Sequence, residues 1–286
     1  VIWIIRLHYS TNEVFFKRIL LELAETKDEK TLNLLINAVS VGELSEKLTI
    51  DESKAIVLNF IDIPEIEKLT IYTLNLVLKK IAKVDPIWVL QFFEKRMEYY
   101  SQIKDKEFYY NPIPFETDFF NIFKDIDKKK LIEVLKRVRN WALKKGIFYF
   151  ESEYVFQKIA VSLNDVSIAV LEEWIKSNNL DRMIRVTHLI RQFPISEALY
   201  HIVEDLIVES ENNDQVISGL RAALGTTETT IRPVGEVSPV YLKKLEFLEK
   251  MRRKSKNLFV KQFAETEIEY IKREIQIEKD MDESFW

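Results

Sequence analysis

The stretch from Asp165 to Gly225 constrains the fold more than any other part of the chain, because its pattern predicts four short amphipathic helices in succession. In each of them a capping residue precedes apolar residues that recur at three- and four-residue spacing. Pro194 is expected to stop the second helix, and Gly225 to take the left-handed conformation past the end of the fourth. Short helices joined by tight loops lie antiparallel to their neighbours, so the pattern predicts an all-α fold, an α-solenoid of antiparallel helix pairs. The expected caps, in chain order, are Asp165, Asp181, Ser196 and either Asn213 or Asp214.

The scarcity of turn residues supports this fold class. The 286 residues include only 5 glycines and 7 prolines, well below ordinary usage, and hairpins and bulges depend on such residues. A chain of this composition is therefore hard to fold as a sheet protein. With 47% hydrophobic residues it can still bury a large core, and helix formers such as Leu, Lys and Glu dominate.

The same pattern continues on both sides of this stretch. Helix pairs recur at roughly 35–45 residues, the spacing of HEAT-type repeats. We therefore expect a HEAT-like repeat array over residues 1–225, followed by a linker and a C-terminal capping helix pair within residues 226–286. Further helices are expected to begin at Asn12, Asp28, Asp85–Pro86, Asp127, Glu151 or Ser152, Ser238–Pro239 and Asn257.

An aromatic and proline-containing segment at about residues 102–125 interrupts the array. It contains Phe108, Tyr109, Tyr110 and Phe115, with two prolines between them, so it cannot form a regular helix. A loop this apolar is expected to pack back on the helices or to cover part of a groove. Two interpretations stay open for its aromatic residues: core contacts between helical layers, or exposed hot spots for a protein partner.

No catalytic or nucleotide-binding motif accompanies this pattern. The five glycines are never clustered, so the sequence lacks the phosphate-binding loop of an NTPase. It contains no cysteine, which excludes disulfides, thiolate zinc sites and cysteine nucleophiles. His188 and His201, with Glu204 and Asp205 nearby, make a metal site conceivable, but without the usual ligand spacing we expect two unrelated histidines. We expect a non-enzymatic segment with no cofactor and no metal.

Three basic clusters are the remaining candidates for binding. Solvated surface is the expected role for each, given a formal net charge of −4 and the acidic residues nearby. The arginine helix is the strongest candidate for a partner site, because arginine makes bidentate contacts with carboxylates and phosphates. The clusters are Lys128–Lys130, the arginines Arg182, Arg185 and Arg191 along one predicted helix, and Arg252–Lys256.

Several segments carry a resemblance to a known family. They are Pro233–Pro239 (PVGEVSP), Tyr241–Leu248 (YLKKLEFL), Ser255–Glu265 (SKNLFVKQFAE), Asn111–Phe115 (NPIPF) and the predicted helix from Leu135 to Gly146. Together they resemble the HEAT-like C-terminal regions of large bacterial NACHT/STAND-type ATPases. The resemblance implies a C-terminal sensing or scaffolding module, in proteins often associated with antiviral defence. No nucleotide-binding residue is carried over, because the ATPase segment is not part of this sequence.

These features predict a helical-repeat interaction module that binds a protein partner, or other domains of its own polypeptide, as the target-sensing part of a larger bacterial NTPase. A stand-alone structural scaffold is the first alternative, and a solenoid that binds nucleic acid through its basic helices is the second. No stretch approaches the ~20 apolar residues of a membrane span, and the N-terminus lacks a signal-peptide pattern, so we expect a cytoplasmic protein with no membrane partner. Because the sequence begins at Val1 rather than Met, we expect a piece of a longer polypeptide.

Overall fold

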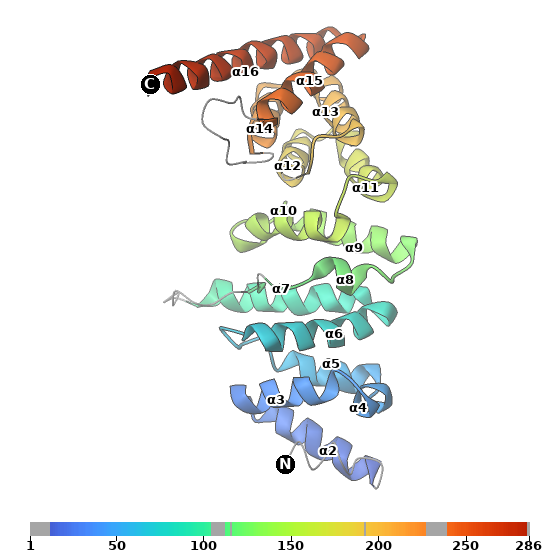
Figure 1. Ribbon diagram of the computed structural model, residues 1–286. Helices are drawn as coiled ribbons and strands as arrows, with labels where there is room; N and C mark the ends of the chain where they lie inside the picture. The colour runs from blue at the N-terminus through green and yellow to red at the C-terminus, as the bar shows by residue number, and fades with distance from the viewer. Residues whose placement is uncertain (1–11, 104–111, 115, 192, 227–238, 285–286) are drawn as a thin grey trace. The chain divides into compact units, whose positions relative to one another are not determined.

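The computed structural model describes residues 12–103, 112–114, 116–191, 193–226 and 239–284 (Figure 1). Every regular element in these ranges is a helix, with fifteen helices and no strand, which confirms the predicted all-α fold. The helices are Glu13–Glu25 (α2), Glu29–Val39 (α3), Glu43–Lys47 (α4), Ile50–Leu58 (α5), Lys68–Val84 (α6), Pro86–Gln102 (α7), Phe119–Phe123 (α8), Lys128–Trp141 (α9), Ile147–Ala160 (α10), Asp165–Ile175 (α11), Leu180–Leu189 (α12), Glu197–Glu209 (α13), Asp214–Thr226 (α14), Pro239–Lys254 (α15) and Leu258–Ser284 (α16).

The chain divides into two compact units. The first comprises residues 1–138 and 146–151, and the second residues 139–145 and 152–286. In the first unit α6 is the central helix and contacts α3, α5, α7 and α8. In the second unit α13 contacts α11, α14, α15 and α16, while α12 packs on α14. The helix pair α15–α16, expected to cap the array, thus belongs to the same unit as α11–α14.

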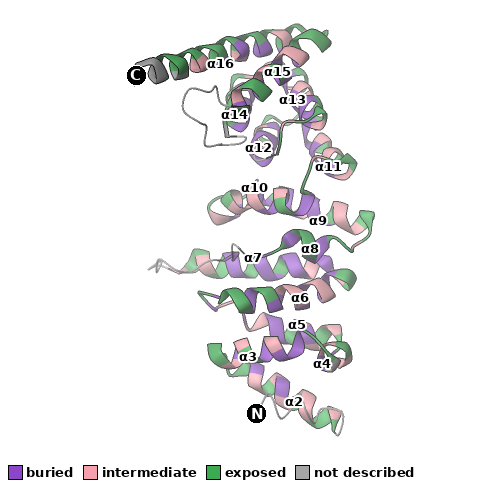
Figure 2. Ribbon diagram, in the orientation of Figure 1, coloured by how far each residue is buried: buried purple, intermediate pink, exposed green. Residues whose placement is uncertain are grey.

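The helices bury one face and expose the other, as Figure 2 shows for both units. In α6 the apolar residues Ile71, Leu74, Leu78 and Ile81 follow the three- and four-residue spacing of one helix face, and each is at most 3% exposed. Burying an aliphatic side chain of this size contributes about 1.5–3 kcal/mol. The periodic apolar pattern therefore identifies both the helices and the faces that they bury.

Capping side chains set the beginnings of many helices where the sequence predicts them. The Asn12 side chain accepts a hydrogen bond from the backbone N–H of Phe15 at 3.2 Å, and the Asp85 side chain accepts one from Trp88 at 3.1 Å. Asp28, Asp127, Ser196 and Asn257 cap their helices in the same way. Each cap satisfies a backbone donor that has no partner within the helix, which contributes about 1 kcal/mol.

Three predicted helix starts are wrong by one to five residues. The cap of α11 is Asn164 instead of Asp165, and the cap of α12 is Asn179 instead of Asp181, because an asparagine one or two residues upstream makes the same bond to the backbone. Helix α10 begins at Ile147, five residues before Ser152, and Ser152 is fully buried inside it. Gly146, with φ of 70°, allows the chain to turn into α10 at that earlier point.

The prediction that Gly225 ends a helix in the left-handed conformation is also wrong. Helix α14 continues through Gly225 to Thr226, and among the described glycines only Gly42 and Gly146 have positive φ. A Cβ atom added at Gly146 or at Gly225 meets no atom within 4 Å. These two glycines therefore differ in backbone conformation and not in the space around them.

This difference predicts opposite effects of the same substitution. Gly146→Ala is expected to lower the free energy of unfolding by about 1 kcal/mol, because an L residue is strained at positive φ. Gly225→Ala is expected to raise it by up to about 1 kcal/mol, because alanine favours the helix. Urea unfolding of both variants beside the wild type measures the two changes, and a change of the same sign in both would refute the explanation.

Residues 112–114, in the middle of the predicted interruption, are buried in the first unit. Ile113 is 2% exposed, and the carbonyl of Pro112 accepts a hydrogen bond from Arg96 Nε at 2.9 Å. The short helix α8 follows, with Phe119 and Phe123 in the core. The predicted partner residues Phe108, Tyr109, Tyr110 and Phe115 lie outside the described residues.

Candidate functional site

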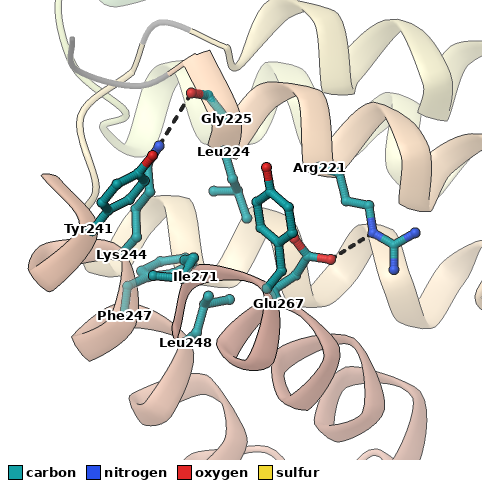
Figure 3. Close-up of a pocket in the computed structure, with 10 residues that line it drawn as sticks. Arg221, Leu224, Gly225, Tyr241, Lys244, Phe247, Leu248, Glu267 and Ile271 are labelled. Atoms are coloured by element: carbon teal, nitrogen blue, oxygen red, sulfur yellow. Dashed lines mark hydrogen bonds and ion pairs between the residues drawn. The ribbon is translucent and has the colours of Figure 1, made fainter. Parts of the chain in front are cut away.

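A small pocket in the second unit is bordered by α14, α15 and α16 (Figure 3). Helices α15 and α16 pack against each other along their apolar faces, and the Asn257 side chain between them caps α16. Helix α14 reaches the pocket with its last two turns, through Arg221, Leu224 and Gly225. The pocket is therefore held by three helices that follow one another along the sequence.

The floor of the pocket is apolar. Leu224 from α14, Phe247 and Leu248 from α15, and Ile271 from α16 line it, and each is at most 8% exposed. The pocket has a volume of about 130 Å³. An engineered protein cavity of about 150 Å³ binds benzene, so the space here matches one aromatic ring or one aliphatic side chain.

Polar groups lie around this floor. Arg221 Nε donates to Glu267 Oε1 at 2.6 Å, which joins α14 to α16. Lys244 Nζ donates to the Gly225 carbonyl at 3.3 Å, near the C-terminal end of α14, where the helix dipole favours a cation. Tyr270 is 56% exposed, and the negative charge of Glu274 raises the pKa of its hydroxyl, which keeps the ring neutral.

The titratable groups among the described lining residues are one arginine, one lysine, two tyrosines and one glutamate. The lining residues include no serine, cysteine or histidine, and their one carboxylate, that of Glu267, already accepts from Arg221. What the pocket offers is a small apolar space with cationic groups beside it.

The arginines predicted to share one helix do not all lie on it. Helix α12 ends at Leu189, well before Pro194, so Arg191 lies beyond it. Arg182 and Arg185 are on α12 and only half-exposed, and Arg185 forms an ion pair with Asp181 at 3.3 Å. Ile190 is the C-cap of α12, and its N–H donates to the carbonyl of Val186 in the last turn of the helix. The prediction that Arg191 shares a helix with Arg182 and Arg185 is therefore wrong, and the role of the three arginines in partner binding stays a prediction.

The two histidines considered for a metal site have different surroundings. His188 is 4% exposed, and its Nδ1 lies 3.2 Å from Glu153 Oε2, so it faces α10. His201 lies on the exposed side of α13, against the ring of Tyr200. Within the described ranges, no group of three or more His, Cys, Asp or Glu side chains is placed to hold a metal ion.

Two buried arginines are the structural residues that sequence reasoning missed. Arg96 is fully buried in the first unit and donates to several loop carbonyls. In the second unit Arg139 lies with its guanidinium 4.5 Å from the centre of the Trp174 ring and donates to the Val170 carbonyl. The signal that could have found them is position: each arginine falls in the apolar stripe of its helix, where a charged residue needs partners.

Glu151, in α10, is a carboxyl group outside the pocket whose burial raises its pKa to about 7. Because this value lies above the 4.5 of an unperturbed glutamate, ionisation opposes folding. The stability that the neutral form provides is fully present below about pH 4.5 and is lost as the pH rises through 7.

Glu151→Gln is therefore expected to stabilise the protein at pH 8 by about 2 kcal/mol, and to have little effect at pH 4.5. Urea unfolding at pH 4.5, 6 and 8 measures the difference between the variant and the wild type. Glu133→Gln, which removes a carboxylate at an exposed position of α9, is the matched control. A constant difference for Glu151→Gln across this range would contradict the raised pKa.

Comparison of the chain with protein-family models, with curated proteins and with solved structures finds no match. The resemblance to C-terminal regions of NACHT/STAND-type ATPases therefore stays a prediction based on short segments. Within the parts of the chain that the structure describes, no helix has the combination of length and apolar character that a membrane span requires. The pocket and its surroundings carry the functional inference.

Proposed function

We propose that this chain is a non-catalytic protein-interaction module that holds one apolar side chain of a partner in the pocket between α14, α15 and α16. The observation that carries the proposal is the pocket itself, with an apolar floor of side-chain size and polar groups around it. Protein interfaces concentrate binding energy in such places, where one aromatic or aliphatic anchor fills a pocket and polar contacts around it exclude water.

The dimensions of the pocket favour a side chain over a small-molecule substrate. Sites for drug-sized ligands typically enclose about 300–1,000 Å³, whereas this pocket measures about 130 Å³. A single ring or branched aliphatic group fills that space, and the rest of the partner then lies on the surface around it. The energy of such a contact comes mainly from the apolar area that it removes from water.

We further propose that the helices form a HEAT-like α-solenoid of antiparallel pairs, and that the module is the target-sensing or scaffolding end of a larger bacterial ATPase. The support is the helical pattern with its capped short helices, together with the resemblance of segments 241–248 and 255–265. The first segment lies within α15 and the second includes the beginning of α16, so the resemblance falls on helices that line the pocket. In such a protein, partner binding would act in the cytoplasm and bias the distant ATPase by a rigid-body change.

Blocking the pocket from within tests the proposed function. Gly225 lies in the lining, and a Cβ added there starts in open space, so Gly225→Leu places an aliphatic side chain at the pocket without a clash at its first atom. The full chain is immobilised and exposed to an extract of its source cells, and captured proteins are quantified by mass spectrometry. We expect the wild type to retain at least one protein whose captured amount falls about tenfold or more with Gly225→Leu.

Gly225→Ala is the matched control, since it adds a Cβ but leaves most of the pocket open. It should capture the same protein as the wild type does. Equal capture by all three forms, or by none of them, would contradict the proposal.

A further inference from the structure

We propose that the partner segment carries a carboxylate directly beside its apolar anchor, and that Arg221 at the edge of the pocket binds this carboxylate. The inference rests on the proposed function, because it specifies the chemistry of the residue that the pocket receives. The occupant is an acidic residue next to an aromatic or aliphatic one, within a single segment of a partner protein.

The bonding of Arg221 leaves room for a second carboxylate. Its Nε donates to Glu267 at 2.6 Å, while its two terminal nitrogens have no partner in the described part of the chain. Figure 3 shows these nitrogens on the side of the guanidinium that faces away from Glu267. The Arg221 side chain is 49% exposed, so a ligand reaches them from solvent. A guanidinium presents its N–H groups in a planar fork that matches a carboxylate.

The charges around the pocket favour an anion. Arg221 and Lys244 contribute two positive charges, and Glu267 contributes one negative charge that is already paired with Arg221 and only 12% exposed. Among the described lining residues, cationic side chains thus outnumber the single carboxylate, which is itself paired with Arg221. Electrostatic complementarity of this kind selects partners of opposite charge and disfavours cationic ones.

The geometry of Arg221 limits where the ligand carboxylate can lie. Arg221 lies on α14 and reaches Glu267 of α16 through its Nε, and its terminal nitrogens lie on the side turned away from that carboxylate. The acidic residue of the partner should therefore approach along α14, with its apolar neighbour over Leu224 and Phe247.

A carboxylate fits this site better than a phosphate. Phosphorylated side chains are commonly recognised by clusters of arginines, whereas one arginine with terminal nitrogens available lines this pocket. One guanidinium fork matches the single charge and two oxygens of a carboxylate.

A pair of small probes with the same ring tests the inference. 3-Phenylpropionate and 3-phenylpropanol differ in charge but present the same apolar group, and each is titrated into the full chain with the Ile and Leu methyl groups observed by NMR. We expect the acid to bind about fivefold more tightly than the alcohol, because a charge-assisted hydrogen bond at a half-exposed site adds a modest amount of affinity. In Arg221→Gln the two probes should bind equally.

Two further variants make the result specific. Arg273→Gln removes the same charge from a more exposed position on α16 that does not line the pocket, and should leave the preference unchanged. Arg221→Gln combined with Glu267→Gln removes both members of the ion pair, so no carboxylate is left unpaired, and should also abolish the preference.

The outcomes separate the two proposals. Equal affinity of the wild type for acid and alcohol would overturn the carboxylate inference and leave the apolar pocket in place. A preference that survives both Arg221 variants would also overturn it. If phenyl phosphate binds more tightly than the acid, the carboxylate inference is overturned, and the site instead recognises a phosphorylated residue of the partner. Absence of binding by either ring probe would instead contradict the proposed function.

Discussion

Replacing Arg96 by leucine is expected to lower the free energy of unfolding by about 4 kcal/mol, the largest effect that we predict for a single substitution. The Arg96 side chain is fully buried and donates to the carbonyls of Phe60, Ile63 and Pro112, with 3.1 Å to Ile63 and 2.9 Å to Pro112. These carbonyls belong to two irregular segments that no helix ladder satisfies. Leucine would fill much of the volume but leave several buried acceptors without a donor.

Urea unfolding monitored by circular dichroism measures this loss. Arg18→Leu is the control, because Arg18 lies on α2 with its side chain 69% exposed and pairs with Glu22 at 3.5 Å. An exposed pair of this kind contributes less than about 1 kcal/mol. Arg96→Lys should recover only part of the stability, since one ammonium group cannot reach all the carbonyls that the guanidinium fork reaches. A loss of less than about 1 kcal/mol in Arg96→Leu would show that these hydrogen bonds do not hold the segments.

Gly219→Ala is expected to destabilise the protein by about 3 kcal/mol. Gly219 lies in α14 where this helix crosses α12, and a Cβ added there would overlap Thr187 Oγ1 and lie 3.0 Å from Thr187 Cβ. The Thr187 hydroxyl already donates to the Ile184 carbonyl at 2.7 Å and its residue is 2% exposed, so it cannot move aside freely. The gain in helix propensity from alanine, about 1 kcal/mol, is smaller than this clash.

A double-mutant cycle tests this explanation. Thr187→Ala removes the hydroxyl oxygen, which is the atom nearest to the new methyl group, and keeps Cβ. In that background Gly219→Ala should cost at least 1 kcal/mol less than in the wild type. The free energies of unfolding of the four forms give this coupling. If Gly219→Ala costs the same with and without the Thr187 side chain, close packing of α12 on α14 is not the reason for its effect.

The sequence predicts the helices of this protein well because their signals are local. A capping side chain such as Asp85 or Ser196 acts on a backbone group three residues away, and an apolar stripe such as that of α6 repeats within one helix. The predicted and observed helix starts differ where two residues can take the same local role, as Asn179 and Asp181 can. Gly219 shows the limit, because only contact with a different helix reveals why glycine is there.

The candidate site could be predicted only in part. Leu224, Leu248 and Ile271 lie in apolar stripes of predicted helices, so their inward direction follows from periodicity. That three such stripes leave a space of about 130 Å³ depends on how the helices pack, which periodicity does not encode. The ion pair of Arg221 with Glu267 joins residues 46 positions apart, and no local spacing connects them.

The claim that the pocket binds one apolar group is tested most directly by titrating 3-phenylpropanol into the full chain and recording the methyl signals of Leu224, Leu248 and Ile271. We predict saturable shifts of these signals in the wild type and in Gly225→Ala, and their loss in Gly225→Leu, where an added side chain occupies the space. Shifts of equal size in Gly225→Leu, or no shift of these signals in the wild type, would contradict the claim.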